Sequence, residues 1–473
     1  MTADINMQNA LIKTKYYPHP IQNIQVSTVI SNNSTSLAGL KVFIKPISFE
    51  FEGKPFVVKA RLSNFSDLNY NIAANGTLDI GKIYKVFAIK GYNVDGTITA
   101  NLYMKGKQSD VMAKRFDQLS NSGSFKVNNI SLTSELFPKP FIIRDGVFSF
   151  TQDKMMFDKF VALYGSSQLT LNGSLSNVID YVMTPNATLN GDFNFTSDKV
   201  TVDDFMAFAS SSPKTQATPA TGVIMVPKNL NLNFTADVKR VNYMGMAINN
   251  SKGQMMIHNG TINLKQTGFN LIGAPVNMDA DYTNNGAKSA YFNYHINATD
   301  FDIKKAYNNI KLFHDMATAA GNAEGLVSLD YKLSGRLNAN MQPVYSSLKG
   351  GGILSAKALK MHGFKLLNAV GSETKHDSLS NNPGVSQVAI KSTIAKNIIT
   401  IEQTKIRVAG FRVRFGGQVG FDKAINLNFR LGLPPLGIIG IPMTITGTQD
   451  NPKVHLGKGK KEDELKEEAD SGN

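Results

Sequence analysis

The sequence predicts a mostly β protein in which the strands join one long, twisted antiparallel sheet. The clearest sign is the strict alternation of apolar and polar residues in "KNLNLNFTADVKRV", residues 228–241. A period of two gives a strand one apolar and one polar face. The same alternation returns in four later segments, at 276–283, 292–299, 327–334 and 425–433.

Composition and turn signals support the same fold class. Charged residues make up only 18% of the chain, and Asn, Ser and Thr fill the deficit, which is typical of solvated strand faces. Asn-Gly and Asp-Gly pairs favour the tight turns of β-hairpins. We therefore expect hairpin turns at these pairs: 75–76, 95–96, 145–146, 172–173, 190–191 and 259–260.

A Ser/Thr/Pro/Ala-rich stretch without apolar periodicity, "ASSSPKTQATPATG", divides the chain. It predicts a first β-rich unit at 1–208, a linker or loop at 209–222 and a second β-rich unit at 223–457. The final run, "KGKKEDELKEEADSGN" at 458–473, is dense in charge. It predicts a solvated, disordered tail.

The two halves of the sequence repeat one another. "FEFEGKPFVVKARLSN" at 49–64 aligns without gaps on "FNLIGAPVNMDADYTN" at 269–284. "DGTITANLYMKG" at 95–106 aligns in the same way on "EGLVSLDYKLSG" at 324–335. Glycines, apolar alternation and turns recur together, which indicates two copies of one unit. The stretches expected to share one order of elements are 41–132 and 261–361.

Helical periodicity is confined to short stretches. The longest predicted helix covers 300–321, with Asp300 or Asp302 as its N-cap and Gly321 as its C-cap. Its apolar stripe consists of Ile303, Tyr307, Ile310, Phe313 and Ala317. Shorter helices are expected at 78–91, 201–210 and 355–371.

The sequence contains no recognisable catalytic or metal-binding pattern. It has no cysteine, and its seven histidines show no ligand spacing. The GxSxG, HExxH, GK[ST] and GxGxxG patterns are absent, so Gly350–Gly352 predicts a turn before a helix. We therefore expect no catalytic residue, no metal site, no cofactor and no enzymatic activity. A hydrolase or a metalloenzyme is the least favoured class.

The formal net charge of +14 limits the choice of partners. Most lysines stand singly on polar strand faces, which indicates simple solubility. Nucleic-acid binding would require clustered Lys and Arg with interleaved aromatic residues in a known module, and we expect none. Attraction to anionic lipid headgroups is the second interpretation of a scattered positive field.

One arginine cluster stands out, formed by Arg407, Arg412, Arg414 and Arg430. Arg412 and Arg414 alternate with apolar residues, which places them on the face opposite the apolar one. The simpler interpretation is a solvated strand face. The alternative is that Arg412 and Arg414 contact lipid headgroups, because arginine pairs well with phosphate.

The sequence as given shows no signal peptide and no membrane-spanning stretch. The N-terminal residues "MTADINMQNALIKT" lack a basic region followed by an apolar one. The most apolar window, "LGLPPLGIIGIPMTI" at 431–445, is short and broken by prolines. We therefore expect a soluble chain or a piece of a longer product.

Four segments in residues 223–456 occur in a diagnostic order. They are "VPKNLNLNFTADVKRVNYMGMAINNSKGQMMIHNGTINL", "ATDFDIKKAYNNI", "GLVSLDYKLSGRLNANMQPVYSSLKGGGILSAKALKMHGFKLLNAVG" and the closing "IPMTITGTQDNPKV". In this order they resemble the AsmA family, in particular its C-terminal region. None of the four is a catalytic motif, so the specificity lies in their order over more than two hundred residues.

The resemblance implies an AsmA-like envelope protein of diderm bacteria, related to the bridge-like lipid transfer proteins. Such proteins are typically held in the inner membrane by one N-terminal helix and extend into the periplasm. They are implicated in phospholipid transfer towards the outer membrane and in outer-membrane biogenesis. The implied partner is phospholipid, and the implied location is the periplasmic side of the envelope. The anchor helix is missing at the start of this chain and is expected in a longer product.

A sheet with one apolar face must be covered by another sheet, by helices or by lipid. The few short helices cannot cover so many strands, so we expect an elongated sheet folded into a U-shaped groove, a β-taco-like repeat that acyl chains fill. The alternative is a structural envelope module with a closed β core and no ligand.

Strand parity selects the apolar residues expected to line the groove and bind lipid. They are Leu230, Leu232, Phe234, Val276, Met278, Phe292, Tyr294, Val327, Leu329, Tyr331, Ile425, Leu427 and Phe429.

Overall fold

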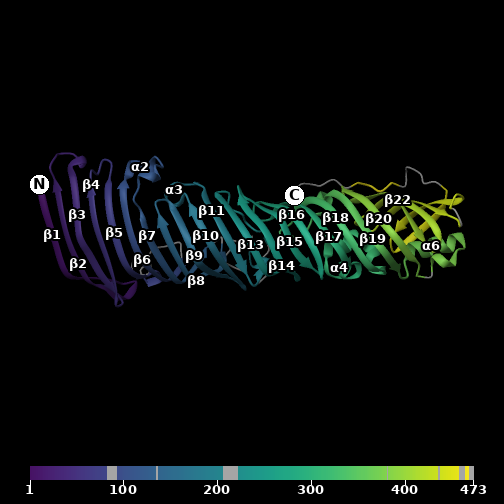
Figure 1. Cartoon of the computed structure of the whole chain (residues 1–473), viewed down its shortest axis with the longest axis horizontal. Coiled ribbons are helices and arrows are strands. Elements are labelled where there is room, and N and C mark those ends of the chain that lie inside the picture. Colours follow the sequence, from purple (N-terminus) through teal and green to yellow (C-terminus); the bar gives the residue numbers. More distant parts are fainter. Residues whose placement is uncertain are drawn as a thin grey trace. The chain divides into compact units, whose positions relative to one another are not determined.

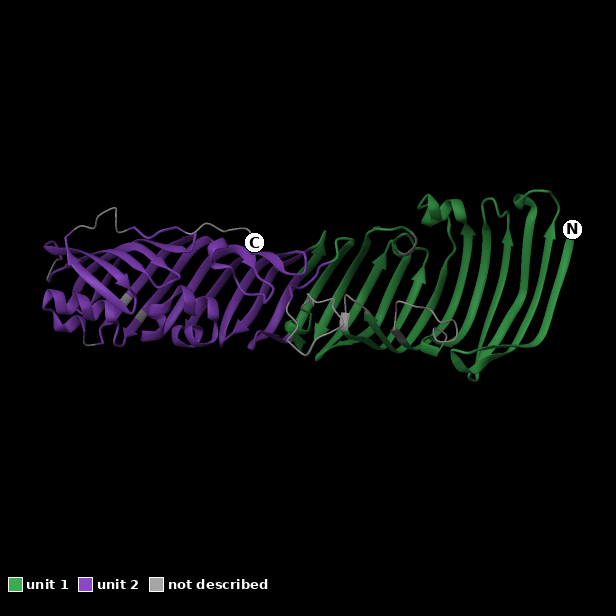
Figure 2. Cartoon of the chain, turned by 180° about the vertical axis from the view of Figure 1, so that it is seen from behind, with its two compact units in different colours: residues 1–205, 227–238, 255–260 green, residues 206–226, 239–254, 261–473 purple. Residues whose placement is uncertain are grey.

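The computed structural model describes residues 1–82, 93–134, 137–205, 222–380, 382–434, 437–457 and 464–467. Strands make up 67% of the chain and helices 13%, which confirms the predicted mostly β class. The chain forms two compact units (Figure 2). The first unit contains Met1–Phe205, Pro227–Val238 and Met255–Gly260, and the remaining described residues form the second unit.

In the first unit the first eleven strands pair antiparallel, each with the next one along the chain (Figure 1). The strands are β1 (Thr2–Thr14), β2 (Tyr17–Asn32), β3 (Leu40–Phe51), β4 (Lys54–Ser63), β5 (Asn69–Asp79), β6 (Asn93–Lys107), β7 (Ser122–Ser134), β8 (Phe137–Thr151), β9 (Lys154–Tyr164), β10 (Ser167–Ser176), β11 (Leu189–Ser197) and the short β12 (Val200–Thr201). Its described helices are single turns or little more: η1 (Leu37–Gly39), α2 (Gln108–Met112), η2 (Phe116–Gln118), α3 (Val178–Met183) and η3 (Val202–Phe205).

Two long strands, β13 (Leu230–Tyr243) and β14 (Met246–His258), contribute residues to both units. The second unit continues with β15 (Thr261–Leu271), β16 (Ala274–Asn285), β17 (Ser289–Asp302), β18 (Ala323–Leu337), β19 (Lys349–Met361), β20 (Gly384–Ala395), β21 (Ile398–Val408), β22 (Phe411–Gly420), β23 (Ile425–Gly432), β24 (Gly440–Thr448) and β25 (Asn451–Leu456). From β15 onward every consecutive pair is antiparallel. Its described helices are α4 (Ile303–Asn309), α5 (Lys311–Met316), η4 (Thr318–Asn322), η5 (Tyr345–Ser347), α6 (Lys365–Thr374) and η6 (Asp377–Leu379).

One strand pair departs from the antiparallel prediction. β11 and β13 run parallel, in register from Leu189 opposite Leu230 to Ser197 opposite Val238. A parallel pair requires a connection of a dozen or more residues that returns the chain to the same end of the sheet. The predicted linker, 209–222, falls in this connection, and all of it except residue 222 lies outside the described residues.

The predicted repeat is visible in the order of elements. β3 to β7 in the first unit correspond to β15 to β19 in the second, and η2 and η5 occupy the same place before the last strand. The irregularities of pairing recur as well. The β3–β4 ladder shifts between Ile44 and Ile47, and the β15–β16 ladder shifts between the aligned residues Leu264 and Thr267. Pairing register, which the sequence match did not contain, thus follows the same pattern in both copies.

In both copies of the repeat a buried leucine packs against a strand glycine at the same position. A Cβ placed on Gly106 would lie 2.6 Å from Leu119, and one on Gly335 would lie 2.7 Å from Leu348. Leu119 is 2% exposed and Leu348 is 0% exposed. Glycine is needed at both strand positions because the leucine side chain occupies the space of a Cβ.

The Asn-Gly and Asp-Gly prediction is right at 259–260, which joins β14 to β15, and wrong at the other five pairs, which lie inside strands. Gly173 shows why. It has a φ of +159°, and an added Cβ would lie 2.1 Å from the carbonyl oxygen of Asp192 on the neighbouring strand. Gly76, Gly96 and Gly173 therefore permit close approach of neighbouring backbones rather than chain reversal. Gly146 and Gly191 leave room for neighbouring side chains.

The helix predicted at 300–321 forms in pieces. Asp302 is its N-cap, and its carboxylate accepts a hydrogen bond from the Lys305 backbone N–H at 2.8 Å. The helix breaks at Ile310, which has extended backbone angles, and continues as α5 and then η4. Gly321 lies inside η4 beneath the Tyr307 ring, so it is not the predicted C-cap.

The remaining helix predictions have mixed outcomes. The stretch 355–371 is wrong in its first half, because β19 continues to Met361 and only α6 is helical. Residues 83–91 and 206–210 of the other two predicted helices lie outside the described residues. Of the predicted tail, residues 464–467 are described, and the Leu465 N–H donates a hydrogen bond to the Gln418 side chain at 3.0 Å.

The triple glycine 350–352 is part of β19 and does not form the predicted turn. An added Cβ on Gly350 or Gly352 would lie 2.1 Å from a backbone oxygen of β18. β19 is hydrogen-bonded to β18 on one side and β20 on the other. The close approach of β18 therefore requires glycine here, and tertiary pairing overrides the local turn propensity.

A buried carboxylate near the end of the first unit predicts acid sensitivity. Burial alone would raise the pKa of Asp204, but Lys139 forms an ion pair with it and Ser166 donates its N–H and hydroxyl, so the pKa lies below the ordinary 3.8. The folded state therefore binds this proton less readily than the unfolded state. Its stabilising contribution is present at neutral pH and is lost as the pH falls below about 4.

We expect Asp204→Asn to lower the urea midpoint at about pH 7 and to flatten its decline towards about pH 3. The matched control is Asp158→Asn, which removes an exposed carboxylate of β9. If both variants show the acid limb of the parent chain, Asp204 does not contribute as described.

Candidate functional site

The apolar face of the first unit is organised in rows that cross the sheet. Successive strand registers place ten residues side by side, one from each of β3 to β11 and β13, and all on the same face. We call these ten residues the phenylalanine row: Phe49, Phe56, Gly76, Ala100, Phe125, Phe148, Phe157, Gly173, Phe193 and Phe234.

Ring contacts follow the phenylalanine row. Ring centroids lie 5.5 Å apart for Phe49 and Phe56, and 4.8 Å apart for the Phe148 and Phe157 pair. Phe157 reaches across Gly173 to Phe193, with centroids 5.4 Å apart. The two glycines of the row leave room for neighbouring rings, since an added Cβ on Gly173 would lie 2.7 Å from the Phe193 ring. Two of the predicted turn pairs, at 75–76 and 172–173, therefore belong to this face.

A second row lies beside the first, again through ten strands and on the same face. Its members are Ile47, Val58, Ala74, Leu102, Gly123, Phe150, Met155, Leu175, Gly191 and Leu232. The intervening strand positions, such as Asn75, Asn101 and Lys126, are exposed on the opposite face. The first unit thus has one continuous apolar face and an opposite, largely polar face, on which Tyr103, Val147 and Met156 are also exposed.

The two rows are only half-buried. All seven phenylalanines of the first row are half-buried, and so are the large side chains of the second row. The described helices α2 and α3 lie at the ends of the strands (Figure 1). Among the described residues of this unit, Ile21, Ile24 and Phe51 form one small buried apolar cluster near its first strands. Val127, Ile130, Phe160, Ala162 and Tyr164 are buried as well. The described part of the first unit therefore leaves the large side chains of the two rows partly accessible.

The corresponding row of the second unit is packed. It runs from Phe269 through Val276, Ala298, Leu329 and Leu354 to Ile390. The first three of these are at most 8% exposed, and the other three pack against the same large cluster. That cluster also contains residues of β21 to β24, α4 and α6. The same repeat thus has a filled core in the second unit and a half-exposed face in the first.

The predicted groove residues divide between these two situations. Leu230, Leu232 and Phe234 belong to the first unit and are half-buried. The other ten belong to the second unit. Seven are part of its large cluster or pack on it: Val276, Met278, Val327, Leu329, Ile425, Leu427 and Phe429. Phe292, Tyr294 and Tyr331 form an adjoining cluster around Leu333 and Leu348, on which Leu329 also packs.

Sequence reasoning missed most of the first unit's face. The rows contain Phe125, Phe148, Phe157 and Phe193, none of which was among the candidates. A signal was present, because "GSFKV" at 123–127 and "GVFSF" at 146–150 alternate as strands do and carry phenylalanine at the same parity. Their alignment into one row could not be derived, because it depends on the register of nine strand pairs.

The predicted headgroup residues lie on the polar face of the second unit. Arg412 and Arg414 are exposed on β22. Arg412 is opposite Arg407 on β21, and Arg414 lies between Lys405 on β21 and Arg430 on β23. Neighbouring strands therefore bring all four predicted arginines together with a lysine.

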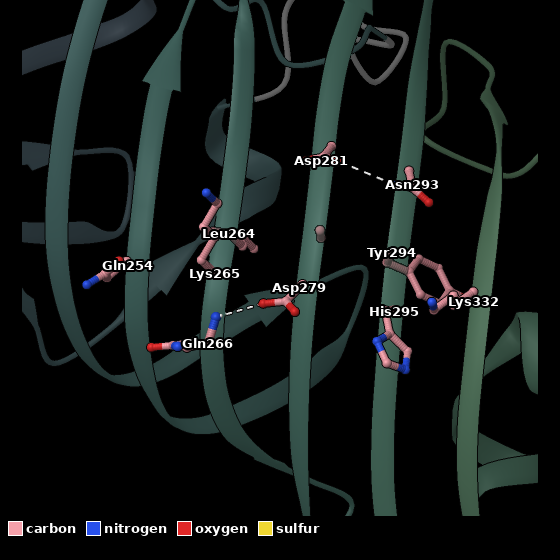
Figure 3. A pocket seen from close by; sticks show the side chains of 11 residues that line it. Gln254, Leu264, Lys265, Gln266, Asp279, Asp281, Asn293, Tyr294, His295 and Lys332 are labelled. Carbon is pink, nitrogen blue, oxygen red and sulfur yellow. Dashed lines mark hydrogen bonds between the residues drawn. The ribbon is translucent and has the colours of Figure 1, made fainter.

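A hollow of about 750 Å³ lies on β14 to β18 of the second unit (Figure 3). Its charged lining is balanced, with Lys265 and Lys332 against Asp279 and Asp281. Both carboxylates already accept hydrogen bonds: Asp279 from the Gln266 N–H at 2.8 Å, and Asp281 from two asparagine side chains. The lining contains no Ser, Thr or Cys nucleophile. The hollow therefore offers neither a nucleophile nor a strong charge preference.

Two further observations concern metals and membranes. In the described ranges, no group of three or more His, Asp or Glu side chains is arranged to hold a metal ion. None of the described helices is long and apolar enough to cross a membrane.

The fold defines a repeated, mostly antiparallel β-sheet protein whose first unit has one continuous apolar face and whose second unit has a packed core. No family model matches the chain, and a search of curated proteins finds no relative.

Proposed function

We propose that the first unit binds phospholipid acyl chains along its phenylalanine row, as part of an AsmA-like protein that transfers phospholipid across the periplasm. The observation that carries this proposal is the half-exposed apolar face, which the same repeat packs with protein in the second unit. In this proposal the sheet of the first unit forms the U-shaped groove, and lipid tails complete its interior.

Physical chemistry supports an apolar occupant. Each square ångström of apolar surface removed from water stabilises by about 25 cal/mol. Soluble proteins rarely leave extended contiguous apolar patches uncovered unless the patch binds something. Acyl chains match a row of aliphatic and aromatic side chains because they need no hydrogen-bond partner. The polar opposite face, with Asn75, Asn101 and Lys126, stays in water.

The second unit supports a different role. Its large cluster includes Val276, Val327 and Leu427, each at most 6% exposed. We propose that this unit is a structural module of the envelope with a closed core, which was the alternative for the whole chain. Catalysis is no part of either role.

Site-specific photo-crosslinking tests the proposal. A benzophenone amino acid replaces Phe125 on the apolar face in one variant and Lys126 on the polar face in the other. The protein is purified from a diderm host, irradiated and analysed by native mass spectrometry with lipid extraction. We expect phospholipid adducts at position 125 and few at position 126. Equal adducts at both positions, or purified chain without extractable phospholipid, would overturn the proposal.

A further inference from the structure

The second unit carries a compact cationic patch on the outer face of β21 to β23. Lys405, Arg414 and Arg430 form one row across three strands, and Arg407 lies opposite Arg412 beside it. We call these five residues the basic patch. The only acidic residue of the three strands, Glu402, is paired with Lys391 at 2.8 Å. In the described part of the chain, Lys405, Arg407, Arg412 and Arg414 form no ion pair, so the patch keeps its charge.

An exposed isoleucine pair stands next to this patch. Ile438 is 75% exposed and Ile439 is 76% exposed, the highest values among the described large apolar side chains after the N-terminal methionine. Single exposed apolar residues are ordinary on a protein surface, but two adjacent ones beside five cations are not explained by solubility.

The arginines hold the segment that presents the isoleucines. The Arg430 guanidinium donates a hydrogen bond to the Ile438 carbonyl at 2.8 Å. Arg412 packs against Gly437, where an added Cβ would lie 2.8 Å from its Cδ, and Arg430 packs against Gly440 in the same manner. The Leu433 N–H also bonds to the Ile439 carbonyl at 2.9 Å. The side chains of Arg412 and Arg430 thus contact the backbone of the segment that carries the two isoleucines. The isoleucine side chains themselves remain exposed to solvent.

We propose that the basic patch and the Ile438–Ile439 pair form a docking site for the surface of an anionic phospholipid bilayer. A bilayer offers phosphate groups above hydrocarbon, which matches arginines beside exposed aliphatic side chains. A nucleic acid would also satisfy the charge, but it favours aromatic side chains for base stacking, and the patch presents isoleucine. This site lies on the polar face and does not depend on lipid binding by the first unit.

Vesicle flotation of the full chain tests the docking site. Vesicles of phosphatidylcholine and phosphatidylglycerol, mixed about three to one, are compared with pure phosphatidylcholine, because the anionic lipid supplies the surface potential. We expect binding to the anionic vesicles that weakens as salt rises. Arg412→Glu with Arg414→Glu should reduce binding at least about tenfold, as should Ile438→Asp with Ile439→Asp.

The matched control is Lys332→Glu with Lys349→Glu, an equal change of charge at exposed lysines of β18 and β19. It should retain most of the binding. The proposal is overturned if the control loses as much as the arginine variant, or if vesicles never bind. Binding to polyglutamate but not to vesicles would also overturn it, in favour of an acidic protein partner. Circular dichroism confirms folding of each variant, and lipid extraction reports separately on the first unit.

Discussion

Replacing Leu427 with Asp is expected to unfold the second unit, lowering its free energy of unfolding by at least about 4 kcal/mol because an unpaired charge would be buried. Leu427 is 6% exposed and belongs to the large cluster. It lies between Gly417 on β22 and the fully buried Ile445 on β24. The described buried residues of this cluster offer a carboxylate no side-chain hydrogen-bond donor and no cation, because they are all apolar.

The matched variant is Leu232→Asp in the first unit. Leu232 is half-buried and lies over Gly191, where an added Cβ would be 3.0 Å from its Cδ2. Because this carboxylate can reach water, we expect a loss of no more than about 1 kcal/mol, together with less co-purifying phospholipid. Urea unfolding and lipid extraction of both variants measure the two effects. Unchanged lipid and a large loss of stability in Leu232→Asp would contradict acyl-chain binding at this position.

Gly352→Val is expected to destabilise the second unit by about 3 kcal/mol through overpacking between paired strands. An added Cβ at Gly352 would lie 2.1 Å from the Asp330 carbonyl oxygen and 2.6 Å from the Tyr331 ring. Tyr331 is 5% exposed, and its hydroxyl is 3.0 Å from that of Ser392. Valine would therefore force either the backbone of β18 or a buried tyrosine to move.

Gly384→Val provides the control for this variant. Gly384 begins β20, and an added Cβ there meets no atom within 4 Å. Valine also favours strands, so we expect little change in stability at this position. Thermal and urea unfolding of the two variants should separate them clearly. Equal stabilities would show that the β18–β19 contact can relax without cost.

The two copies of the repeat differ in how their apolar row is covered, and this difference separates their proposed functions. Two copies of one strand order share ladder irregularities and the buried leucine at Leu119 and Leu348. The second copy presents mainly aliphatic residues in its row and packs them with protein. The first presents phenylalanine at most positions of the equivalent row and leaves them half-buried. Duplication followed by different covering of the apolar face would produce one structural unit and one ligand-binding unit.

Local pattern was sufficient for several features. The alternation at 276–283, 292–299, 327–334 and 425–433 identified β16, β17, β18 and β23, because one buried face imposes a period of two. The repeat also followed from the sequence, since glycines and apolar positions recur together. Asp302, one of the two residues predicted as N-cap, caps the helix, because capping depends on a side chain and a backbone N–H only three residues apart.

Other features depended on contacts between distant segments. Asn75–Gly76 and Asn172–Gly173 read as turns, yet each glycine lies within a strand because a neighbouring backbone or ring occupies the place of its Cβ. The same reason placed the triple glycine 350–352 inside β19. Local propensity does not contain the position of the neighbouring strand, and at these sites that neighbour decides the conformation.

By itself the sequence determined the fold class, the repeat and which residues share a face within each strand, because these follow from local chemistry and period. Tertiary structure alone decided that β11 and β13 run parallel, that phenylalanines from separate strands join one row, and that Leu427 is buried whereas Leu232 is half-exposed. Parity tells which face a side chain takes, but the register of each strand pair and the covering of that face arise from contacts between segments far apart in the chain.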